Sequence, residues 1–176
     1  MSDRDEAVSF DLIREAPRAV WSSDTGRLRF GGNRDNPGGF AIHPRPFLLL
    51  EDDTRHAELL ETHPRWTDNG WIRGEFWVPQ VVPGHRLLAE IGFIQPIGEP
   101  RTSGVRLAVR FDGTTLHEMT KLYTGRLAAI EVDLAAYAGK AGLLTLEVTA
   151  NGSSTQAWLV WVNPRIGASG SAGKNR

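Results

Sequence analysis

Apolar and polar residues alternate with a period of two along most of this chain, a pattern that predicts β-strands rather than helices. In the clearest run, Val105 to Phe111, every second residue is apolar and two of the intervening ones are arginine. Five segments share the pattern: 8–12, 87–93, 105–111, 128–134 and 144–150. Each is expected to have one buried face and one wet face.

Other segments depart from this pattern. Trp158 to Val162 is apolar at both parities, which predicts a central strand that places Trp158 and Trp161 in the core. Asn163 and Arg165 follow this strand and are positioned to face a pocket at the loop rim. Two short stretches contain helix formers. Thr54–Glu61 is interpreted as a strand despite its AELLE sequence, and Asp133–Lys140 as a helical turn capped by Asp and ended by Gly139.

Turn-forming residues separate the strands at intervals typical of sandwiches and jelly rolls. The breaks include GGNRDNPGG from Gly31, QPIGEPRTSG from Gln95 and ANGSS from Ala150. The sequence therefore predicts an all-β fold, an antiparallel β-sandwich of jelly-roll type with little helix. We expect one domain over residues 1–166 and a flexible C-terminal tail over residues 167–176.

Composition narrows the function classes. The chain has 176 residues, 40% of them hydrophobic and 23% charged, with a formal net charge of −1, so it lacks the basic character that nucleic-acid binding needs. It contains no run of about 20 apolar residues, which argues against a membrane span. The absence of Cys excludes disulfides, thiolate metal sites and cysteine nucleophiles. We expect neither nucleic acid nor membrane as a partner.

The segment Trp71 to Val78 carries the most informative alternation. Trp71, Arg73, Glu75 and Trp77 share one face, and the other face is apolar with a low spot at Gly74. Flat aromatic rings beside charged hydrogen-bonding groups suit a sugar. The alternative is that the two tryptophans pack under loops while Arg73 and Glu75 form an ion pair across strands.

A polar and aromatic loop leads into this strand. It contains His63, Trp66, Asp68 and Asn69. Loops on a rigid sandwich often hold ligand groups, so the loop is predicted to join the sugar site. Asp68 and Asn69 before Gly70 are equally typical of a tight turn.

The sequence contains none of the common local catalytic motifs. The five histidines form neither H-x-H nor H-E-x-x-H, and G-x-S-x-G is missing from the predicted fold. A carboxylate pair for glycoside hydrolysis has no fixed spacing in sequence. Four acids on predicted strands are expected to be solubilising groups on wet faces: Glu58, Glu61, Glu75 and Glu90. We do not expect an enzyme, and no cofactor is required.

The C-terminal part resembles the closing strands of galactose-binding-like jelly rolls, particularly bacterial carbohydrate-binding modules attached to glycosidases. The resemblance rests on Asp133-Leu134, Ala138-Gly139, Trp158 and Asn163-Pro164-Arg165. Gln156 stands where such modules often have an acid. The resemblance implies two antiparallel sheets packed face to face, and it implies sugar binding by analogy.

The same resemblance suggests a structural calcium ion, and Glu51, Asp52 and Asp53 supply carboxylate oxygens within one turn. The alternative is a solvated acidic turn.

We therefore expect a non-catalytic recognition module whose ligand is a carbohydrate. The alternatives are a structural or protein-interaction module that contacts another protein chain and, third, a sandwich-type enzyme. The sequence shows no signal peptide. We expect a cytoplasmic protein if this is the full chain and an extracellular one if it is a module of a secreted parent.

Overall fold

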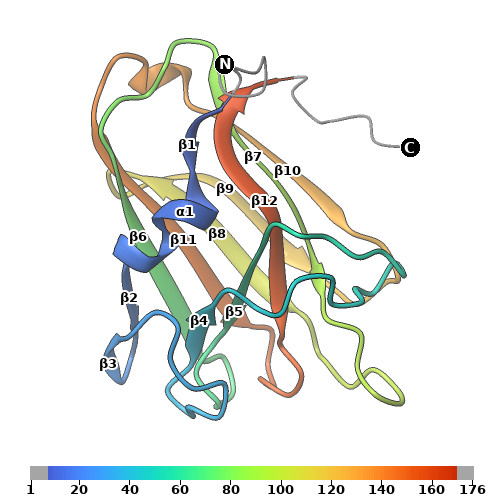
Figure 1. The fold of residues 1–176 in the computed structure, drawn as a ribbon. Coiled ribbons are helices and arrows are strands. Elements are labelled where there is room, and N and C mark those ends of the chain that lie inside the picture. Colours follow the sequence, from blue (N-terminus) through green and yellow to red (C-terminus); the bar gives the residue numbers. More distant parts are fainter. Residues whose placement is uncertain (1–7, 170–176) are drawn as a thin grey trace.

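The computed structural model describes residues 8–169 and contains two antiparallel sheets packed face to face (Figure 1). Sheet A has the strand order β10-β7-β12-β5-β4, and β1 also pairs with β12. Sheet B has the order β3-β2-β6-β11-β8-β9. This arrangement confirms the predicted all-β sandwich of jelly-roll type.

The elements follow one another along the chain with little helix. The strands of sheet A are β1 (Val8–Asp11), β4 (Phe40–Ile42), β5 (Leu59–His63), β7 (His85–Phe93), β10 (Ala128–Asp133) and β12 (Leu159–Ala168). The strands of sheet B are β2 (Val20–Ser23), β3 (Gly26–Leu28), β6 (Trp71–Val78), β8 (Val105–Phe111), β9 (Thr114–Lys121) and β11 (Gly142–Ala150). The helical pieces are α1 (Leu12–Glu15) and the 3-10 turns Ala16–Arg18 and Ala135–Tyr137.

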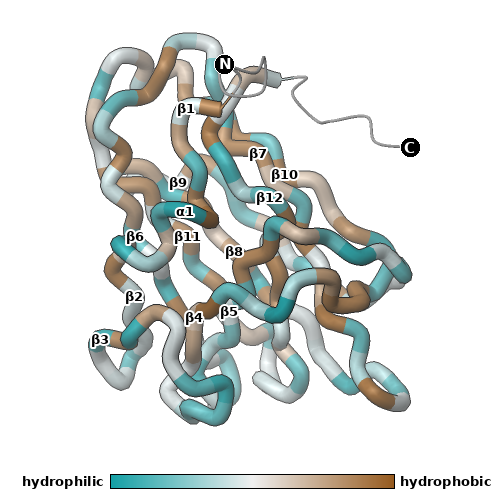
Figure 2. The backbone as a smooth tube through the Cα atoms, viewed as in Figure 1, coloured by the Kyte–Doolittle hydropathy of each residue, from teal (hydrophilic) through white to brown (hydrophobic). Residues whose placement is uncertain are grey.

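The core between the sheets is built from the residues that the alternation predicted. Along the strands, apolar and polar positions alternate visibly (Figure 2). Phe111 of sheet B and Trp161 of sheet A are both fully buried. The low spot predicted at Gly74 is filled by the Trp21 ring, which would lie 2.5 Å from a Cβ at that position. Glycine at this position therefore lets Trp21 pack against the sheet.

The position of β12 in the middle of sheet A, between β7 and β5, confirms the predicted central strand. Trp158 was predicted wrongly, because β12 begins only at Leu159 and Trp158 is partly exposed at the end of the preceding loop. At the other end β12 continues to Ala168, two residues beyond the predicted fold boundary. Residues 170–176 of the predicted tail lie outside the described residues.

Two other boundaries differ from the sequence-based predictions, and one predicted turn is confirmed. The segment predicted as a strand over Thr54–Glu61 is regular only over Leu59–His63. The first strand ends at Asp11 because the Asp11 carboxylate caps α1, accepting hydrogen bonds from the N–H groups of Ile13 (2.9 Å) and Arg14 (3.3 Å). The turn predicted after Asp133 is confirmed as a 3-10 turn.

A second, smaller apolar cluster lies on the outer face of sheet A. It is formed by Leu50, Leu59, Val160 and Val162. Leu50 comes from the long segment between β4 and β5, which therefore covers this part of the sheet. No helix within residues 8–169 is long and apolar enough to cross a membrane.

Candidate functional site

The structure decides which face of β6 meets solvent. Ile72, Phe76 and Val78 are buried in the core. On the opposite face Trp77 is 64% exposed, while Trp71, Arg73 and Glu75 are half-buried. The predicted polar and aromatic face is therefore the outer face of the sandwich.

The two tryptophans of this face do not form one site. They are six residues apart on an extended strand, which separates them by about 20 Å. Trp71 lies at the end of β6 that follows the loop 64–70, and Trp77 lies at the opposite end. The predicted continuous surface is therefore divided into two regions.

The loop before β6 is held by its own backbone and by the neighbouring β11–β12 loop. Asn69 adopts a left-handed conformation, with φ 56°. Its N–H donates to the Gly152 carbonyl at 2.7 Å, and its Oδ1 accepts a hydrogen bond from Arg106 at 3.1 Å. Asn69 thus acts as a turn former, while Asp68 and Trp66 remain exposed.

His63 was predicted in the exposed loop, but it belongs to β5 and is buried. Its ring stacks on Phe40 at 5.3 Å and meets Trp66 edge-on at 6.1 Å. Burial, together with the nearby charge of Arg34, lowers the pKa of His63 to about 4, although its hydrogen bond to the Pro64 carbonyl acts in the opposite direction. The imidazole therefore supports the Trp66 loop from below rather than facing a ligand.

Arg73 pairs across strands, but its partner is Glu147 of β11 rather than Glu75. Its Nε and Nη2 donate to Glu147 Oε2 at 2.9 and 2.6 Å, and its guanidinium stacks on Trp71 at 5.0 Å. Arg110 of β8 binds the other Glu147 oxygen at 3.2 Å. Burial raises the pKa of the Glu147 carboxyl, but the hydrogen bonds and charges of Arg110 and Arg73 outweigh it, so that its pKa is lowered.

A shallow hollow of about 430 Å³ adjoins this network on the outer face of sheet B. The small Ala108 side chain lies between Arg106 and Arg110, which are also lining residues. Neither Trp71 nor Trp77 lines this hollow.

A larger hollow of about 760 Å³, here called the side groove, is lined by residues from the end of β6 and from β1, α1 and β12. Its lining residues come from segments far apart in sequence: Val8, Ser9, Phe10, Asp11, Arg14, Glu15, Trp77, Pro79, Asn163 and Arg165. The groove combines the most exposed tryptophan with amide, hydroxyl and charged groups.

A bulge in β12 positions two polar residues of the side groove, Asn163 and Arg165. The pairing with β7 shifts register between Val162 and Arg165, and Asn163 is left-handed with φ 47°. Asn163 and Arg165 line a pocket, as predicted, but they lie within β12 rather than after it, so that the pocket is not at a loop rim. The contributions of Ser9, Asp11 and Arg14 were missed. The capping pattern at Asp11 was their only local signal.

The acidic turn predicted to bind calcium has other partners. The Glu51 carboxylate is buried and lies 2.6 Å from the Lys121 ammonium. It also accepts hydrogen bonds from the backbone N–H groups of Phe93, Thr124 and Gly125. Asp52 caps its own turn through Thr54, and Asp53 accepts a hydrogen bond from Gln95.

Within residues 8–169 no group of three or more His or acidic side chains is arranged to hold a metal ion. The surroundings of Glu51 do not suit a bound cation, because the ammonium of Lys121 already neutralises the Glu51 carboxylate.

The sequence matches no protein-family model and no curated protein, whereas the fold matches solved structures. A CBM61 module, TmCBM61 in complex with β-1,4-galactotriose, aligns with a TM-score of 0.53 at 12% identity, covering 89% of this chain and 92% of that one. The CBM51-2 and INT domains of Clostridium perfringens ZmpB, in complex with GlcNAc, align with a TM-score of 0.52 at 16% identity.

The second alignment covers 70% of this chain and 25% of the other one. This chain therefore spans about a quarter of the length of that protein. At these identities the comparisons establish a shared fold, the jelly-roll sandwich of bacterial carbohydrate-binding modules.

Proposed function

We propose that the protein is a non-catalytic carbohydrate-binding module and that a sugar binds in the side groove against Trp77. The observation that carries the proposal is that the most exposed tryptophan, at 64%, lines the larger of the two hollows. The shared fold with modules solved in complex with galactotriose and GlcNAc supports the ligand class.

The chemistry of the groove suits a pyranose. The apolar CH face of a sugar packs on an indole ring, and its hydroxyls need both donors and acceptors. Asn163 provides an amide and Ser9 a hydroxyl, and Arg14 adds further N–H donors. A ligand held this way gains contact area from one ring and its orientation from the polar rim.

A glycan array followed by calorimetry tests the proposal. Trp77→Ala should weaken binding of the best glycan by about tenfold or more, because stacking area is lost. Trp66→Ala is the matched control, since Trp66 is 48% exposed and lies outside the groove. Equal affinities of both variants and the wild type would exclude the side groove as the site.

The Trp71–Arg73 surface is a second candidate position for the same function. Its supporting observation is the stacked Arg73 guanidinium, which is fixed by Glu147 and leaves Trp71 half-buried. Trp71→Ala distinguishes the two positions, because it should reduce affinity only if the sugar binds at this end of β6. A folded protein that binds no glycan would favour an interaction with another protein chain.

A further inference from the structure

The charged side chains of the side groove differ in whether they have a hydrogen-bonding partner or a partner of opposite charge. The Asp11 carboxylate caps α1, and Glu15 accepts a hydrogen bond from Arg18 at 3.0 Å. Arg14 and Arg165 line the same groove, and within residues 8–169 neither forms an ion pair. Both acids therefore have partners, whereas neither arginine has a carboxylate.

Arg165 is the unusual member of this group because it is only 8% exposed. Its Nη1 donates to the Asn163 carbonyl at 3.0 Å. Burial lowers the pKa of its guanidinium, and the charge of Glu90 acts in the opposite direction without a hydrogen bond. Burying a charge away from water is costly unless a partner compensates it.

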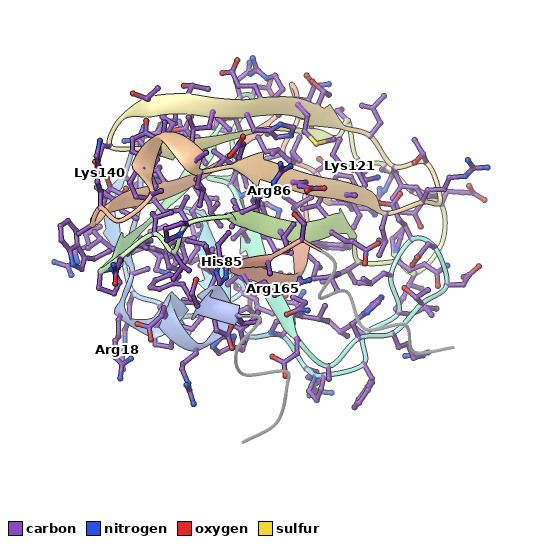
Figure 3. All side chains as sticks on the ribbon, turned by 90° about the horizontal axis from the view of Figure 1, so that it is seen from above. Arg18, His85, Arg86, Lys121, Lys140 and Arg165 are labelled. Atoms are coloured by element: carbon purple, nitrogen blue, oxygen red, sulfur yellow. The ribbon has the colours of Figure 1, made fainter. Side chains whose placement is uncertain are left out.

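The position of Arg165 is set by the fold rather than by a flexible loop. It follows the β12 bulge and stands opposite Leu88 of β7 on one side and Asp11 of β1 on the other. In Figure 3 Arg165 lies on the central strand β12, whereas Arg18 lies at the edge of the molecule. His85 of the adjacent strand β7 pairs with Ala168 and not with Arg165. The His85 ring is occupied by Ser9, whose hydroxyl lies 2.8 Å from Nδ1.

We infer that the side groove takes a glycan that carries an acidic group, a carboxylate or a sulfate ester, and that Arg165 binds this group. The inference rests on the proposed function and adds the class of sugar. Guanidinium matches the geometry of such anions through paired N–H donors. The two arginines and two acids of the groove cancel formally, so that selectivity comes from hydrogen bonding at Arg165 and not from a long-range field.

Calorimetry with matched trisaccharides tests the inference. The probes form two pairs that differ in charge: β-1,4-galactotriose with its sulfated form, and trigalacturonic acid with its methyl ester. In each pair the acidic probe should bind about tenfold or more tightly than the neutral one. Binding of one acidic probe but not the other identifies which anion the groove accepts.

Arg165→Gln should remove the preference for the acidic probe, so that the ratio of the affinities for the acidic and the neutral probe falls to about one. If this variant fails to fold, the methyl ester of trigalacturonic acid removes the charge from the ligand instead and should bind the wild type about tenfold or more weakly than the acid does. Equal affinity of the wild type for acidic and neutral probes would overturn the inference while leaving the proposed function intact. Absence of binding across the whole glycan array would overturn both.

Discussion

The outer faces of the two sheets differ in how deeply a glutamate is buried and in how many of its hydrogen bonds are made. On sheet A, Glu61 of β5 is buried on the side of the sheet where Leu59 and Val160 also pack. One carboxylate oxygen binds Arg34 at 2.7 Å, and the other has no hydrogen-bond partner within the described residues. On sheet B, Glu147 is only half-buried and is bound by two arginines, Arg73 and Arg110.

The pKa values move in opposite directions as a result. Burial raises the pKa of Glu61 to about 7, and the charge and hydrogen bond of Arg34 offset this only in part. The pKa of Glu147 is lowered, because two arginines outweigh its burial. An ionised carboxylate on a covered sheet face thus destabilises the folded state unless all of its hydrogen bonds are made.

In the core between the sheets, truncating a buried aromatic side chain should cost about the same stability in either sheet. Phe111→Ala in sheet B and Trp161→Ala in sheet A should each lower the free energy of unfolding by about 3 to 5 kcal/mol, because both side chains are fully buried. Chemical denaturation measures the loss. A cost below about 1 kcal/mol for either variant would mean that its sheet is not packed as described.

The covered face should show two opposing pH dependences. The folded-state pKa of Glu61 is about 7 against an ordinary 4.5, so its contribution to stability is lost as the pH rises through that range. The folded-state pKa of His63 is about 4 against 6.5, so its contribution is lost as the pH falls through that range. Over its whole pH range, each group changes the free energy of unfolding by at most about 3 kcal/mol.

Two variants separate these contributions. Glu61→Gln should leave a stability that rises between about pH 4 and pH 6.5, owing to His63. His63→Gln should leave a stability that falls between about pH 4.5 and pH 7, owing to Glu61. Urea unfolding at several pH values gives the slopes, and identical profiles for both variants would contradict the assignment.

The open face should respond more weakly. Glu147→Gln should cost about 1 kcal/mol near neutral pH, since the pairs with Arg73 and Arg110 are partly screened by solvent. The gap to the wild type should narrow in high salt and below pH 4.5, where the ordinary carboxyl becomes protonated. Glu118→Gln is the control, because Glu118 is exposed on the same face, and it should change the unfolding midpoint little.

Calcium should have the smallest effect. Because Lys121 neutralises Glu51, we expect the same thermal midpoint in EDTA and in excess Ca²⁺. A midpoint that rises with Ca²⁺ and falls again with EDTA would instead restore the calcium site at Glu51, Asp52 and Asp53.

The sequence by itself determined the strands whose two faces differ in polarity. Alternation is a local property of the backbone, since neighbouring side chains point to opposite sides, so Phe111, Ile72 and Gly74 could be assigned before the fold was known. Trp158 was misplaced because a run that is apolar at both parities does not mark where the strand begins.

Only the tertiary structure decided which of these residues meet one another. Trp77 and Arg165 line one groove although they are far apart in sequence, and Glu147 rather than Glu75 binds Arg73. Strand order and register set these pairs, and they depend on the packing of the whole sandwich, which no local pattern encodes. The side groove exists because β1, α1, β6 and β12 come together at one side of the molecule.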